Sequence, residues 1–156
     1  MADSNPGDVL NRVLARLYRS LMQYAVDCWP WTSSTDTAAS DSPGSDSPGQ
    51  KSIEQMTARQ QEFVARLADL ITSRGNVVDF GSFRDNSELN YVSLDYLLGK
   101  LIADEQGLIA ELQVALPALQ HDAEATALVS ELLAVETQNL TQLRELSRSV
   151  SATVAA

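Results

Sequence analysis

Apolar residues recur at spacings of three and four in four stretches of the chain. The stretches span about residues 8–29, 53–74, 87–119 and 123–149. This spacing places the apolar side chains on one face of an α-helix, and the alternating pattern of a half-buried strand is not found. Four helices with one apolar face each predict an all-α four-helix bundle, formed by a single domain over residues 1–156.

The segment 32–52 has a different composition, rich in Ser, Thr, Asp, Pro and Gly. It contains the pentapeptide Ser-Asp-Ser-Pro-Gly twice, at 40–44 and at 45–49. A segment with so little apolar surface cannot offset the entropy that is lost on ordering. We therefore predict a flexible linker after the first helix, which Pro30 ends.

The segment 75–86 determines the topology that we expect. Its twelve residues reach about 40 Å when extended, and the helix before it is about 33 Å long. This length allows, without requiring, a crossover along the bundle, with the second and third helices parallel. The turn at His121 and Asp122 is short, so the last two helices form an antiparallel hairpin. Two antiparallel hairpins joined by a crossover loop are therefore the arrangement that we expect. The loop is too apolar for a free linker, so we expect it to pack on the bundle; its apolar residues are Val77, Val78, Phe80 and Phe83.

The composition excludes several classes of function. The 156 residues carry a formal net charge of −10, with a pI near 4.4, and −7 of this charge falls in residues 87–156. Such acidity argues against nucleic acid or an anionic membrane as the main partner. A single Cys (Cys28) and a single His (His121) exclude a disulfide framework and a Cys/His zinc site within one chain. Without an apolar run of membrane-spanning length or a signal-peptide pattern, we expect a cytoplasmic protein.

Four polar residues interrupt the apolar faces of the last three helices. Gln60 lies on the second helix, Glu105 near the middle of the third, and Glu136 and Asn139 on the fourth. This pattern resembles the ferritin-like superfamily, in which two helices each supply a Glu to a di-iron site and the other two each supply a Glu-x-x-His pair. Glu105 matches the Glu of the third helix. Glu136-Thr-Gln-Asn139 takes the place of the motif on the fourth helix, with Asn instead of His.

The resemblance covers most of residues 8–29 and 53–148 but only half of the motif. The first helix has Leu17 and Tyr18 where the family has a Glu, and the second helix has no Glu-x-x-His pair. A di-iron centre needs about four carboxylates together with imidazoles. The resemblance therefore implies a ferritin-like bundle without catalytic activity or cofactor, in a structural or protein-interaction role.

Two alternatives remain open. A metal-binding protein or oxidoreductase would hold iron or manganese at a reduced site made of Glu105, Glu136 and Asn139. A bundle unrelated to ferritins would serve as an adaptor. In either of the metal-free interpretations, the two buried carboxyl groups share protons or hydrogen-bond to Gln60, Asn139 or a tyrosine, and so fix the register of the helices.

The sequence Cys28-Trp29-Pro30-Trp31 marks the end of the first helix. Trp29 and Trp31 either cover the end of the core or form an exposed aromatic anchor for a partner. That partner would be another protein or a second copy of the chain, which makes a homodimer one expected state.

Overall fold

The computed structural model describes residues 5–27, 48–82, 85–89 and 92–155. Within these ranges the chain is helical and contains no strand. No helix in the described ranges combines the length and the apolar character that a bilayer crossing requires. The helices are α1 (Pro6–Tyr18), α2 (Leu21–Asp27), α3 (Pro48–Ser73), η2 (Ser87–Leu89, a short 3-10 helix), α4 (Leu94–Ala118) and α5 (Ala123–Ala155).

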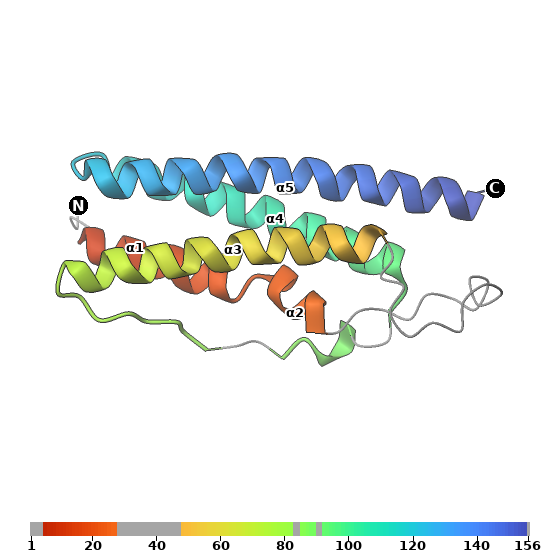
Figure 1. The fold of residues 1–156 in the computed structure, drawn as a ribbon, viewed down its shortest axis with the longest axis horizontal. Coiled ribbons are helices and arrows are strands. Elements are labelled where there is room, and N and C mark those ends of the chain that lie inside the picture. Colours follow the sequence, from red (N-terminus) through yellow and green to blue (C-terminus); the bar gives the residue numbers. More distant parts are fainter. Residues whose placement is uncertain (1–4, 28–47, 83–84, 90–91, 156) are drawn as a thin grey trace.

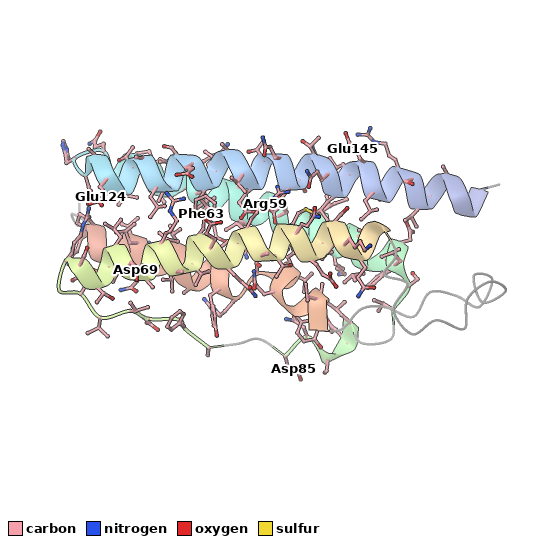
Figure 2. The ribbon with its side chains drawn as sticks, in the orientation of Figure 1. Arg59, Phe63, Asp69, Asp85, Glu124 and Glu145 are labelled. Atoms are coloured by element: carbon pink, nitrogen blue, oxygen red, sulfur yellow. The ribbon has the colours of Figure 1, made fainter. Side chains whose placement is uncertain are left out.

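The long helices pack side by side as an all-α bundle (Figure 1). α1 packs against α3 and α4, α5 packs against the same two helices, and α2 continues the side of the bundle that α1 begins. Figure 1 shows that the chain returns along the bundle between α3 and α4, so these two helices run in the same direction. Charged side chains such as Asp69 and Glu145 project outward (Figure 2). The all-α class and the four-helix packing predicted from the sequence are confirmed.

The returning segment is attached to α1 by its backbone. The Asn11 side chain donates a hydrogen bond to the Val77 carbonyl (2.9 Å) and accepts one from the Asp79 N–H (2.9 Å). The Phe80 ring lies 4.8 Å from the ring of Tyr18. One amide side chain thus satisfies two backbone groups of a segment that has no helix or strand to satisfy them.

The apolar residues of this segment differ in their burial. Val78 is half-buried against the core, and Phe80 is partly covered by Tyr18. Val77 is 85% exposed, so the loop packs on the bundle through Val78 and Phe80 and not through Val77. Its carbonyl is bonded to Asn11, and this contact leaves the Val77 side chain in solvent. Phe83 lies outside the described residues.

The predicted boundaries of three helices need correction. The second predicted helix, at 53–74, begins earlier, because Pro48 occupies its first position, where a proline loses no hydrogen bond. The last five residues of the predicted linker are therefore helical. The third predicted helix, at 87–119, begins only at Leu94, because the side chain of Ser93 caps it by accepting from the Tyr96 N–H (3.3 Å).

The fourth predicted helix, at 123–149, continues to Ala155. Leu146 and Val150 still pack against the core at that end, which supports the additional turns. Its beginning is as predicted: His121 is exposed in a turn, and the Asp122 carboxylate accepts from the Ala125 N–H (3.1 Å). The same carboxylate pairs with Arg74 at the end of α3 (2.7 Å), so one side chain joins the two hairpins.

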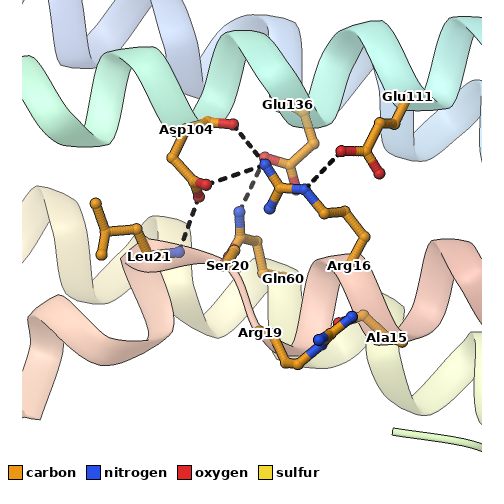
Figure 3. Close-up of polar contacts among 9 residues, drawn as sticks. All are labelled: Ala15, Arg16, Arg19, Ser20, Leu21, Gln60, Asp104, Glu111 and Glu136. Carbon is orange, nitrogen blue, oxygen red and sulfur yellow. Dashed lines mark hydrogen bonds and ion pairs between the residues drawn. The ribbon is translucent and has the colours of Figure 1, made fainter. Parts of the chain in front are cut away.

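The first predicted helix, at 8–29, is not continuous. It is interrupted at Arg19 and Ser20, and α2 begins at Leu21. The Asp104 carboxylate on α4 spans the break: one oxygen accepts from the Leu21 N–H (2.8 Å), and the other pairs with Arg16 (3.0 Å) (Figure 3). The first free N–H group of α2 is thus capped by a side chain from another helix. The end of this predicted helix, at Cys28 and beyond, lies outside the described residues.

Within the described part of the chain, the apolar core forms two clusters rather than one. The larger lies among α1, the second half of α3, the second half of α4 and the first half of α5. The smaller lies among α2 and the other halves of the same three helices. Its buried members are Met22, Ala25, Ile53, Met56, Leu97, Leu98, Leu101 and Leu143. The boundary between the clusters falls at the break between α1 and α2.

Replacing Asp104 with alanine removes the cap of α2 and one partner of Arg16. We expect Asp104→Ala to lower the free energy of unfolding by about 1–3 kcal/mol, because a partly buried N–H and a guanidinium lose their acceptor. Urea denaturation followed by circular dichroism measures the change. Asp69→Ala, which removes an exposed carboxylate from α3, is the matched control and should change stability little. Equal effects of the two substitutions would contradict this role for Asp104.

Candidate functional site

A layer of polar side chains separates the two apolar clusters. Ser20 lies at the break between α1 and α2, Gln60 on α3, Glu105 on α4, and Glu136 and Asn139 on α5. Each is at most 1% exposed. Every corner of the bundle therefore contributes a polar group to the same level of the interior.

The layer is joined by hydrogen bonds that run from one helix to the next. The Ser20 hydroxyl donates to the Gln60 carbonyl oxygen Oε1 (2.7 Å). The Gln60 amide donates to Glu136 Oε2 (3.1 Å), and the Asn139 amide donates to the same oxygen (3.0 Å). Figure 3 shows Gln60 between Ser20 and Glu136. Two N–H donors on one oxygen suit an ionised carboxylate.

Glu105 is the second carboxyl group of the layer. Burial raises its pKa to about 11, and hydrogen bonding to Glu136, the negative charge of Glu136 and that of Asp104 act in the same direction. Arg16 lowers the pKa but does not outweigh these effects. At neutral pH Glu105 thus keeps its proton, and the two amide donors lie on Glu136.

Two buried oxygens of the pair receive no hydrogen bond from outside the pair. They are Oε1 of Glu105 and Oε1 of Glu136, to which no other described side chain donates. A buried carboxylate oxygen is costly unless a proton, a donor or a cation accompanies it. Chemically, the layer can therefore hold a shared proton between its carboxyl groups or accept a single cation there.

The structure brings together the three residues that the sequence predicts as metal ligands. Glu105, Glu136 and Asn139 all lie in the layer, and Gln60 is buried beside them. However, the Asn139 amide turns its nitrogen toward Glu136, and its oxygen accepts from Arg59 (3.5 Å). Asn139 therefore acts as a hydrogen-bond donor to the carboxylate. Among the described residues, no group of three or more His, Cys, Asp or Glu side chains is placed to hold a metal ion.

The sequence interpretation missed Ser20 as a member of the layer. Ser20 lies at the break between α1 and α2, where its hydroxyl donates to Gln60 and Asp104 of another helix accepts from the Leu21 N–H. The signal was present in the spacing, because Ser20 lies three residues after Leu17 and four before Tyr24, on the apolar face. The second predicted site, Trp29 and Trp31, lies outside the described residues.

No protein-family model, curated protein or solved structure matches this chain. The resemblance to the ferritin-like superfamily thus stays a prediction from residues 8–29 and 53–148. The function has to be inferred from the chemistry of the layer itself and from the surface of the bundle.

The raised pKa of Glu105 predicts a specific pH dependence of stability. The folded chain keeps this proton up to about pH 11, whereas an unfolded chain releases it near pH 4. Between these values the folded state binds more protons, so the free energy of unfolding falls as the pH rises. Glu105→Gln needs no proton and escapes this loss. We expect the free energy of unfolding of the variant to rise relative to that of the wild type by up to about 1.4 kcal/mol for each unit by which the pH is raised. Urea denaturation at several pH values measures this difference.

The matched control is Glu145→Gln, which removes an exposed carboxylate from α5. Its free energy of unfolding should follow that of the wild type across the neutral and mildly alkaline range. If the Glu105→Gln curve also runs parallel to the wild type, Glu105 does not hold a proton in the folded state.

Proposed function

We propose that this chain is a non-catalytic bundle of ferritin-like architecture, with a structural or protein-interaction role that includes association with a second copy of itself. The observation that carries the proposal is the occupation of Glu136 Oε2 by two amide donors, Gln60 and Asn139. A donor N–H at each of these positions competes with a metal ion for the same oxygen lone pairs. The layer is built to satisfy a carboxylate by hydrogen bonds.

Such a layer fixes how the helices are aligned. Ser20, Gln60 and Glu136 come from three corners of the bundle, and each bonds to the next. Sliding one helix by a turn, about 5.4 Å, would leave these buried groups without partners, at a cost of about 1–3 kcal/mol each. Apolar contacts alone distinguish weakly between helix registers that differ by one turn, so the polar layer supports a single register. A rigid scaffold with one register suits an interaction module.

The relative direction of the helices supports the ferritin-like part of the proposal. α3 and α4 run the same way and are separated by a segment that returns along the bundle (Figure 1). One long crossover between two hairpins is the connectivity of ferritin-like folds. The polar layer also lies mid-bundle, where such folds place their carboxylates.

A second candidate function is a metal-binding protein or oxidoreductase with a reduced carboxylate site. It is favoured by the two buried oxygens that receive no hydrogen bond from outside the pair, Oε1 of Glu105 and Oε1 of Glu136. Two carboxylates would suit a single iron or manganese ion, which prefers oxygen ligands of this kind. In this alternative the cation replaces the shared proton.

Metal analysis of the purified chain separates the two candidates. Because we assign the layer a proton, we expect iron and manganese well below one equivalent per chain. We also expect no rise in melting temperature when either metal is added, since no folded-state site gains binding energy. Elemental analysis and thermal denaturation with and without metal give these quantities.

Glu105→Gln and Glu136→Gln complete the design. One equivalent of metal in the wild type that is lost in both variants would overturn the structural proposal in favour of the metal-binding one. Glu111→Gln, on the same helix but more than half exposed, controls for metal that binds to surface carboxylates.

A further inference from the structure

A groove on the surface lies between α1 and α4, away from the polar layer. It has a volume of about 400 Å³. Its floor is apolar and belongs to the larger core cluster, with Val9, Val13 and Leu112 among its lining residues. The bundle thus presents a hollow that lies directly over buried core side chains.

An exposed valine stands at the same groove. Val114 lines it from α4 and is 78% exposed, one of the few large apolar side chains of the described chain that face solvent. One turn before and one turn after it are Ala110 and Ala118, which also line the groove. Their small side chains leave room for another helix to approach α4 closely on either side of Val114. This face of the bundle therefore carries a projection, the Val114 side chain, beside a hollow, the groove between α1 and α4.

Charged groups at the rim of the groove complement each other. Arg12 is exposed, and no described residue pairs with its guanidinium. Glu111 lies across the groove on α4; it bonds to Arg16 through Oε1 (3.0 Å), and its side chain is 60% exposed. Glu111 therefore has a second carboxylate oxygen that a cation from outside can reach. The same face offers one free cation and one accessible anion.

We propose that this groove is the contact surface of a two-fold symmetric homodimer, in which Val114 of each copy enters the groove of the other. A two-fold interface requires a patch that is complementary to itself, so that each element meets its counterpart on the other copy. The projection and the hollow satisfy this requirement for shape, and Arg12 and Glu111 satisfy it for charge. The inference deepens the proposed function, on which it rests, by naming the self-association surface.

A second copy of the chain fits this surface better than an unrelated occupant. A second copy brings its own Glu111, which is more than half exposed, toward a rim where Arg12 has no partner among the described residues. One groove and one projection per copy make a small interface, which corresponds to a reversible dimer rather than a permanent one. The equilibrium is thus expected in the micromolar range.

Sedimentation velocity of the full chain over a series of concentrations tests the proposal. We expect the wild type to pass from monomer to dimer as the concentration rises. Val114→Glu should weaken dimerisation about tenfold or more, because it places a charge at the centre of an apolar contact. The matched control is Val77→Glu, which changes a valine that is 85% exposed on the crossover segment and should leave the dimer unchanged.

A second pair of variants tests the charges. Arg12→Glu should weaken the dimer severalfold by opposing Glu111 of the other copy, whereas Arg148→Glu makes the same charge change at an exposed position on α5 and should have no such effect. Circular dichroism checks that each variant is folded. Unchanged dimerisation of folded Val114→Glu and Arg12→Glu would overturn this surface and leave the structural role of the polar layer standing.

A wild type that stays monomeric at several hundred micromolar would also overturn the proposal and leave the groove to a different partner. Stoichiometric metal binding, in contrast, would overturn the proposed function without changing the effect of Val114→Glu on the dimer. The two failures are therefore distinguishable.

Discussion

Two carboxyl groups buried side by side cannot both be ionised in a protein interior. Glu105 and Glu136 meet this constraint by dividing their roles: burial and the neighbouring charge keep the proton on Glu105, and two amides stabilise Glu136. The rest of the layer follows from this division. Gln60 must turn its nitrogen toward Glu136, which leaves its oxygen to accept from Ser20. The position of the proton on Glu105 thus determines how the other side chains of the layer are oriented.

The same constraint accounts for the interrupted first helix. Ser20 reaches Gln60 from a break in the helix, and the break exposes the N–H of Leu21. Asp104 accepts from this N–H and pairs with Arg16 (Figure 3). Asp104 immediately precedes Glu105 on α4, so of two consecutive acidic residues the first caps the break and the second lies in the buried layer. These two acidic residues therefore have structural roles in the bundle.

The helical periodicity was sufficient to predict the all-α bundle, because each helix buries one regular apolar face. It also placed Gln60, Glu105, Glu136 and Asn139 inside, since they interrupt such faces. The direction of the Asn139 amide and the role of Asp104 were not predictable, because both depend on contacts between helices that are distant in sequence. Helix ends were misplaced where a local cap decided them.

The division of the core into two apolar clusters has a consequence for how the molecule opens. Hydrogen bonds of the polar layer depend on alignment, and they lie where the two clusters would otherwise merge. Local unfolding in proteins follows cooperative units with their own stabilities. Among the described residues, the end that contains α2 has the smaller cluster and a helix of seven residues, so we expect it to be the less stable unit. We therefore expect fluctuations that expose the carboxyl pair to water to begin at that end.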